Sequence, residues 1–147
     1  MQNRQAQIFE PALDPSVPDS AAAHWDDTEL RILDAASAML LTHGIDGLTI
    51  TGIAARAGLS RPTVYRRWQG TDDVVRATLL RTTISLFARL GDLPLTGPEL
   101  AAAVVQFSRL FREDPLFKHL LEHQPELFTQ YSLERLGSSQ RFMLHWI

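Results

Sequence analysis

The sequence predicts an all-α protein, and three observations lead to that prediction. Apolar residues recur at intervals of three and four, as they do along one face of a helix. Glycines and prolines, often beside Ser, Thr or Asp, divide the chain into segments of helical length. No stretch alternates convincingly between apolar and polar residues, so no β-strand is predicted.

Composition narrows the class of protein. The 147 residues are enough for one domain and part of another, and 45% hydrophobic with 21% charged residues is typical of a globular protein. Cysteine is absent, which excludes disulfides and thiolate metal sites. No apolar run approaches the ~20 residues of a membrane helix, and the N-terminus lacks the layout of a signal peptide. We therefore expect a cytoplasmic protein.

The first helix is predicted over residues 27–43. Residues 1–24, rich in Pro, Gln, Asp, Ser and Ala, are expected to form a flexible arm before it. Asp26 and Glu29 have the spacing of a capping box, which satisfies the free amides of a first turn. Gly44 can take the left-handed conformation that ends a helix.

A helix-turn-helix is predicted next. A short second helix begins at Thr49 or Thr51, either of which could cap it, and ends at Ala57. Gly58 can adopt the positive φ of the tight turn that follows. The apolar seam between the two helices is expected to contain Ile53, Ala57, Leu59 and Val64.

The third helix is predicted from a cap at Ser60 to Trp68–Gly70, and its first turn tolerates a proline. Residues 56–67 contain four arginines and no acidic residue, although the whole chain has a net charge of -3. A local basic island on an acidic chain indicates a use for the charge, such as binding nucleic acid. A solvated arginine-bearing helix in a bundle is the alternative.

A helical wheel shows which side of the third helix each residue of this basic segment occupies. Val64 and Trp68 point into the seam, so the opposite face presents Pro62, Thr63, Tyr65 and Arg66, with Arg61 and Arg67 on the shoulders. Arginine can bond guanine in the major groove, and a threonine methyl can contact thymine. Phosphate is the expected partner of Tyr65 and Arg67, and of the first-turn amides at Ser60 and Arg61. The third helix is therefore predicted to be a recognition helix.

Helices are also predicted for the rest of the chain. The fourth is capped by Thr71, carries Asp72 and Asp73 in its first turn, and ends near Leu90 before Gly91. The later helices are expected over 98–113, 115–123 and 125–136, with the start of an eighth over 141–147.

The segment from Thr49 to Trp68 reads T-I-x-x-I-A-x-x-A-G-L-S-x-x-T-V-Y-x-x-W. With its surroundings, residues 31–80, it strongly resembles the N-terminal domain of the TetR family of bacterial transcriptional regulators. The resemblance implies a ligand-responsive repressor that binds an inverted-repeat DNA operator as a homodimer. It also implies a small-molecule inducer whose binding among the later helices moves the fourth helix. The DNA-contacting residues are then expected to be Thr49, Thr51, Ser60, Arg61, Pro62, Thr63, Tyr65, Arg66, Arg67 and Thr71.

Two features depart from the family pattern. Thr71 stands where the family usually has a phosphate-clamping lysine, which predicts weaker binding to the DNA backbone. The chain also stops at Ile147, early in the expected eighth helix, so the regulatory region, residues 72–147 after a DNA-binding domain of residues 25–71, is expected to be shortened. The alternative function is a shortened relative that acts as a protein-interaction partner and does not bind an operator on its own.

The later half of the chain contains candidate residues for a ligand pocket and for a metal site. The candidates for the pocket are mostly apolar: Phe87, Leu90, Phe107, Phe111, His119, His123 and Phe128. Residues 119–123 match H-x-x-E-H, a zinc protease signature. A catalytic zinc needs a third protein ligand, which only Glu126 or Glu134 could supply, by proximity alone. We expect no metal, no cofactor and no enzymatic activity.

Overall fold

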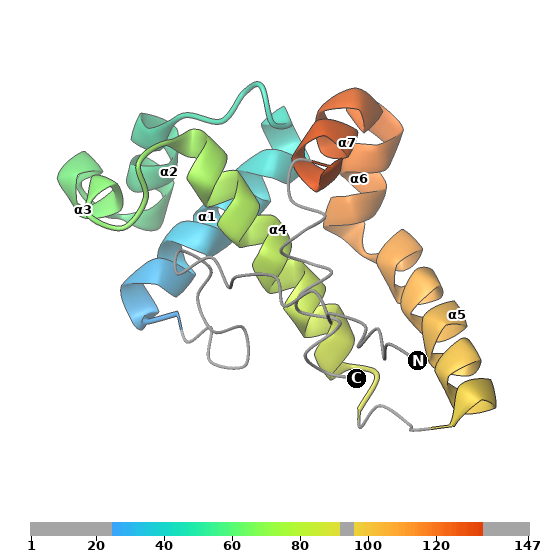
Figure 1. Cartoon of the computed structure of the whole chain (residues 1–147). Coiled ribbons are helices and arrows are strands. Elements are labelled where there is room, and N and C mark those ends of the chain that lie inside the picture. Colours follow the sequence, from blue (N-terminus) through green and yellow to red (C-terminus); the bar gives the residue numbers. More distant parts are fainter. Residues whose placement is uncertain (1–24, 92–95, 134–147) are drawn as a thin grey trace, which may run out of the picture.

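The computed structural model describes residues 25–91 and 96–133, which form seven helices and contain no strand (Figure 1). The all-α prediction is confirmed. The helices are α1 (Asp27–His43), α2 (Ile50–Ala57), α3 (Arg61–Tyr65), α4 (Thr71–Ala88), α5 (Gly97–Glu113), α6 (Pro115–His123) and α7 (Pro125–Leu133). Within the described ranges no helix is long and apolar enough to span a membrane.

The capping box at the start of α1 is present as predicted. The Glu29 amide donates to Asp26 Oδ1 and the Asp26 amide donates to Glu29 Oε2, both over 2.8 Å. The helix ends at Gly44, whose φ of 69° and ψ of -174° suit glycine alone. Its bounds match those expected from the sequence.

The helix α2 is capped by Thr49 and not by Thr51. Thr49 Oγ1 accepts the Gly52 amide over 3.0 Å, while Thr51 is exposed on the first turn. Gly58 is left-handed, with φ 67° and ψ 38°, and ends the helix as predicted. The Gly58 and Leu59 amides bond back to the carbonyls of Ala55 and Ala54, which is a Schellman motif.

The helix α3 is shorter than the sequence predicted, because it ends at Tyr65 and not near Trp68. The amides of Arg67 and Trp68 both donate to the Val64 carbonyl, over 3.0 and 3.1 Å. Sharing one carbonyl tightens the last turn beyond α-helical geometry. The inward face is as expected, since Val64 is fully buried and Trp68 is half-buried.

The start and the end of α4 differ from the predictions. Its N-cap is Gly70, without a side-chain cap, so the expected cap at Thr71 is wrong and Thr71 is the first helical residue. Asp73 Oδ2, in the first turn, accepts the amide of Gln69, which lies just before the N-cap, over 3.2 Å. The helix ends at Ala88 and not near Leu90, because the next two amides bond to carbonyls three residues back, which tightens the turn.

The later helices pack back onto α1 and α4. The helices α5 and α6 lie within one residue of the expected bounds, and α7 agrees as far as Leu133. The helix α6 contacts both α1 and α5, so one hydrophobic core runs from α1 to α7. The expected arm over residues 1–24 and the eighth helix over 141–147 lie outside the described residues.

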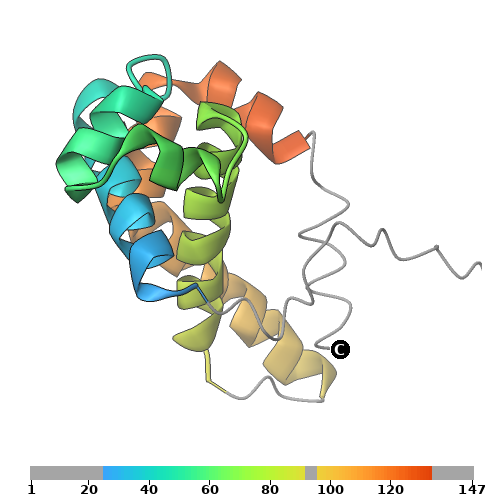
Figure 2. The same ribbon diagram turned by 90° about the vertical axis from the view of Figure 1, so that its left-hand side faces the viewer.

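The arrangement leaves α3 open on one side. In Figure 1, α3 lies at one edge of the molecule and α5 at the opposite edge, with α4 running between them. The view in Figure 2 is from the side of α2 and α3, and no other described helix covers them there. The helix-turn-helix is therefore held by the core from behind and exposed in front.

Candidate nucleic-acid interface

The exposed face of α3 carries the residues that the helical wheel assigned to it. Arg61, Pro62, Tyr65 and Arg66 are exposed, and Tyr65 keeps 55% of its surface open to solvent. Val64 is fully buried on the other side of the helix. One buried valine therefore anchors a helix whose remaining surface is free to meet a partner.

A polar chain runs along this face. An Nη2 hydrogen of Arg66 is donated to Thr63 Oγ1 over 3.2 Å, and the hydroxyls of Thr63 and Ser60 share a hydrogen bond of 2.8 Å. Ser60 Oγ also accepts the Thr63 amide, over 3.3 Å, and so caps the helix as predicted. Because one guanidinium hydrogen is held by Thr63, Arg66 is oriented while its other donors stay available.

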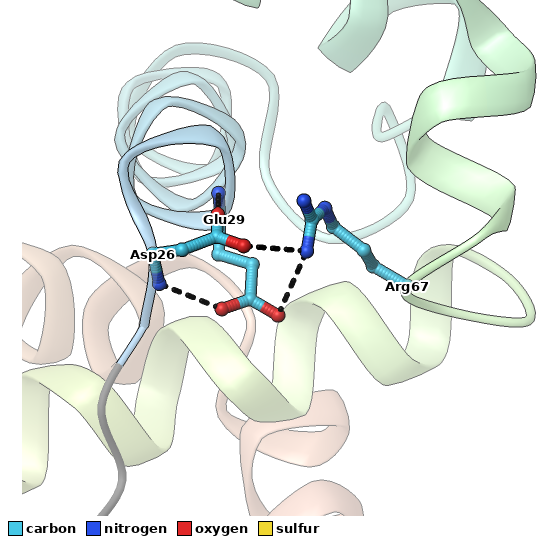
Figure 3. Close-up of polar contacts among 3 residues, drawn as sticks. All are labelled: Asp26, Glu29 and Arg67. Carbon is cyan, nitrogen blue, oxygen red and sulfur yellow. Dashed lines mark hydrogen bonds and ion pairs between the residues drawn. The ribbon is translucent and has the colours of Figure 1, made fainter.

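Arg67 lies differently, as Figure 3 shows. Its Nη1 atom lies 2.7 Å from Asp26 Oδ2 and 3.5 Å from Glu29 Oε1. Each carboxylate thus uses one oxygen in the capping box of α1 and the other for Arg67 (Figure 3). The side chain predicted to bind phosphate is paired with two acids in the free protein.

The ionisation of Asp26 follows from these contacts. The hydrogen bond from the Glu29 backbone N–H has the largest effect and lowers the pKa of the Asp26 carboxyl below its ordinary value of 3.8. Desolvation, the next largest effect, raises this pKa, and the charge of Arg67 lowers it again. Asp26 is therefore ionised at neutral pH, when Arg67 is also charged.

The threonines predicted to contact DNA flank α3. Thr49 and Thr51 lie at the start of α2, and Thr71 at the start of α4, where it is half-buried. The Thr49 hydroxyl accepts a hydrogen bond in its cap, which leaves its own hydrogen free to donate. All three positions supply a hydroxyl and no charge.

The phenylalanines proposed for a pocket contact one another. The rings of Phe87 and Phe107 stack with centroids 4.4 Å apart, as do those of Phe111 and Phe117 at 4.3 Å. The pair Phe107 and Phe111, at 6.2 Å, joins the two stacks. Phe128 completes this aromatic row, which therefore links α4, α5, α6 and α7. Phe117, which was not predicted for the pocket, belongs to the row as well, because it stacks on Phe111 and meets the ring of Phe128 edge-on.

The other pocket candidates lie apart from these stacks. His119 and His123 stack on each other along α6, with centroids 4.3 Å apart, and His123 is exposed. Leu90 is half-buried just beyond the end of α4. Among the described residues, no three His, Asp or Glu side chains are grouped so that they could hold a metal ion.

A shallow cavity between α1 and α2 was not anticipated. It has a volume of about 380 Å³ and is lined by Arg31, Asp34, Ala35, Ala38, Arg56 and Ala57. An Nη2 hydrogen of Arg31 is donated to the Ala57 carbonyl over 2.7 Å, at the end of α2. This contact joins residues 26 apart in the chain, so no local pattern indicated it.

Residues 32–78, from α1 into α4, match the family model of the bacterial regulatory proteins of the tetR family. Over these residues the chain has the sequence pattern of the tetR family. All the candidate DNA contacts, from Thr49 to Thr71, lie inside the matched segment, whereas the aromatic row lies beyond it. The tetR-family match therefore covers the helix-turn-helix and not the proposed pocket.

The chain matches part of the length of its curated relatives. It is 39% identical over 121 residues to an uncharacterized HTH-type transcriptional regulator of Mycobacterium bovis, a match that covers 80% of the chain and 61% of the relative. The chain therefore spans about three-fifths of the length of that relative.

Two solved structures share the fold. The fatty acid degradation regulator FadR from Bacillus halodurans aligns with a TM-score of 0.58 and 16% identity, over 84% of this chain and 67% of FadR. A complex of SmeT with triclosan aligns with a TM-score of 0.51 and 23% identity, over 82% of this chain and 68% of SmeT. At these identities the likeness concerns the all-α fold alone.

Proposed function

We propose that this tetR-family regulator represses transcription in the cytoplasm by binding an inverted-repeat operator as a homodimer, and that a small apolar molecule releases it. The observation that carries the proposal is the exposed face of α3, where Thr63, Tyr65 and Arg66 project from a helix anchored by the buried Val64. A helix presented in this way fits the major groove of DNA.

Base reading is assigned to Arg66 and Thr63. The bond from Arg66 to Thr63 Oγ1 holds the guanidinium in place, so less freedom is lost when it bonds the O6 and N7 atoms of a guanine. The Thr63 methyl is available for a thymine methyl beside it. Neighbouring base pairs would then be read by two side chains that support each other.

Phosphate contacts are assigned to the rest of the surface. Tyr65 has a phenol that can donate to a phosphate oxygen, and Arg61 supplies a charge at the start of α3. These contacts orient the helix on the duplex and carry no sequence information. The remaining proposed contacts are Thr49, Thr51, Ser60, Pro62 and Thr71.

The aromatic row is the proposed inducer site. Phe87, Phe107 and Phe111 are each only partly buried, so their stacked rings could open to admit an apolar ligand between α4 and α5. SmeT, which shares the fold, was solved with triclosan, an observation about that protein that makes aromatic compounds the first class to test here.

Three hydrogen bonds connect the helices of this site to the segments on either side of the helix-turn-helix. Gln124, between α6 and α7, accepts the Ile45 amide over 2.5 Å and donates to Asp46 over 3.2 Å, both in the loop between α1 and α2. The Tyr131 hydroxyl of α7 donates to Asp72, in the first turn of α4, over 2.6 Å. A ligand that shifts α6 and α7 would therefore move the segments before α2 and after α3.

The test is selection of duplexes from a random DNA pool by the purified chain. An inverted repeat with half-sites about one helical turn apart, roughly 10 base pairs, is the expected result. Arg109→Ala is the matched control, because it removes an exposed arginine from α5, away from the proposed interface. Recovery of no common sequence would contradict operator binding, and recovery of single half-sites would contradict the homodimer.

A further inference from the structure

We propose that Arg67 is a positioning residue, which sets the angle of α3 by clamping the turn after it to the start of α1, and does not bind phosphate. The proposal rests on the proposed function, because the angle of α3 matters only if that helix enters a groove. It is carried by the two ion pairs of Arg67 with Asp26 and Glu29 (Figure 3).

The short α3 has little packing surface of its own. It has five residues, and only Val64 among them is buried, with Trp68 half-buried in the turn that follows. One buried side chain can hold the helix against α2 but defines its rotation poorly. A contact at Arg67, beyond the end of the helix and across to α1, adds a second fixed point.

The two carboxylates are held in place before Arg67 reaches them. The capping box fixes Asp26 through its Oδ1 atom and Glu29 through its Oε2 atom, which leaves Oδ2 and Oε1 for the guanidinium. The three side chains are partly covered, at 30% exposure for Arg67, 51% for Asp26 and 24% for Glu29. The capping box of α1 thus also supplies the two carboxylates that bind Arg67 after α3.

The charge of this cluster opposes a phosphate contact. One guanidinium and two carboxylates sum to a single negative charge, so a DNA phosphate brought to Arg67 also meets two acids. Simple electrostatics then predicts that removing the acids should strengthen DNA binding. The clamp predicts the opposite sign, because the same change releases Arg67 and loosens α3.

The test compares the full chain with the double variant Asp26→Asn/Glu29→Gln. Asparagine remains a good N-cap and glutamine serves in a capping box, so α1 keeps its start while the ion pairs are lost. We expect the double variant to bind the selected operator about two- to fivefold more weakly, the size expected for partly exposed ion pairs. Operator binding equal to or tighter than that of the wild type would overturn the proposal.

Arg67→Gln provides a second readout through salt dependence. Loss of a phosphate contact lowers the slope of log K against log salt by about 0.9, whereas loss of a positioning contact leaves the slope unchanged. We expect weaker operator binding with the wild-type slope, and a slope reduced by about 0.9 would overturn the proposal. Asp34→Asn is the matched control, because it breaks another ion pair of α1, with Arg81 at 2.7 Å, without touching α3.

A measurement without DNA separates this proposal from the proposed function. The amides of Arg66, Arg67 and Trp68 close the turn after α3, and they should exchange with solvent faster in the double variant than in the wild type. Unchanged exchange would overturn the clamp whatever the protein binds. Failure of the wild type to select any DNA would overturn the proposed function alone.

Discussion

Single residues on α3 divide the proposed DNA contact into two kinds. Thr63 and Arg66 are joined by a hydrogen bond on the outer face of the helix. Tyr65 lies beside them with 55% of the residue's surface exposed to solvent. Groups that read bases and groups that hold phosphate respond differently to mutation, because only the former distinguish sequences. The two classes can therefore be separated by experiment.

Arg66→Ala and Thr63→Ala should each relax operator specificity, at a cost of about 1–3 kcal/mol on the best sequence. Tyr65→Phe should instead weaken binding to all sequences alike. Binding to a library of operator variants measures both effects. Equal binding of wild type and Arg66→Ala across the library would contradict the assignment of Arg66.

The bond between Thr63 and Arg66 adds a further expectation. Removing Thr63 also releases the guanidinium of Arg66, so the double variant should lose less than the sum of the two single losses. Additive losses in a double-mutant cycle would show that the two side chains act independently on the operator.

Two glycines should respond unequally to alanine. Gly58→Ala should cost about 1–2 kcal/mol, the strain of a left-handed residue. Gly44→Ala should cost more, because its backbone conformation is open almost only to glycine and the new Cβ would overlap the Gln124 amide. Denaturant unfolding measures both.

The control for this pair is Gly97→Ala at the start of α5. Gly97 has no positive φ, and a Cβ there meets no atom within 4 Å, so the free energy of unfolding should stay the same or rise slightly. If Gly58→Ala proved more costly than Gly44→Ala, the overlap with Gln124 would not be significant.

At the scale of elements, the junction of α6 and α7 ties the later helices to the loop after α1. From the sequence, Gln124 is only the residue before Pro125 and was predicted to separate two helices. In the structure its amide satisfies the Ile45 N–H and bonds Asp46 as well. Gln124 therefore both precedes the proline that starts α7 and makes a tertiary contact with the loop after α1.

Gln124→Ala should cost about 1–3 kcal/mol, because it leaves the partly buried N–H of Ile45 without its acceptor. Hydrogen exchange at the Ile45 amide should rise in the variant more than exchange at the amides of α1. The matched control is Gln106→Ala, which removes an exposed glutamine from α5. Equal exchange at Ile45 in Gln124→Ala and wild type would contradict the role of this side chain.

At the scale of the whole molecule, the helix-turn-helix and the later helices share one core. Phe117 of α6 and Leu33 of α1 belong to the same buried cluster, and both are almost fully buried. The division predicted between residues 71 and 72 therefore does not coincide with a break in the core, because the packing runs across it. Such a core favours unfolding as one cooperative unit.

Phe117→Ala should cost about 3–5 kcal/mol, the usual loss for a buried phenylalanine, and should destabilise α1–α3 together with α6. Tryptophan fluorescence, which includes the signal of Trp68 beside α3, and far-UV circular dichroism should then give one coincident transition. A fluorescence transition unchanged by Phe117→Ala would contradict the shared core.

Local chemistry determined much of this protein from the sequence by itself. The cap at Asp26, the left-handed Gly58 and the spacing of Val64 and Trp68 act within a few residues, so the bounds of α1, the turn and the inward face of α3 followed directly. Local rules were less reliable where a turn tightened, as after Tyr65, and at the start of α4, where Gly70 is the N-cap and no side chain caps the helix.

Only the tertiary structure decided the contacts between distant segments. Arg67 and Gln124 were each predicted for a local or external role, and both find their partners far away in the chain, at Asp26 and Ile45. The aromatic row is of the same kind, since four helices contribute to it. A sequence pattern records what a side chain can bond, and only the packing of the helices determines which distant partner comes within reach.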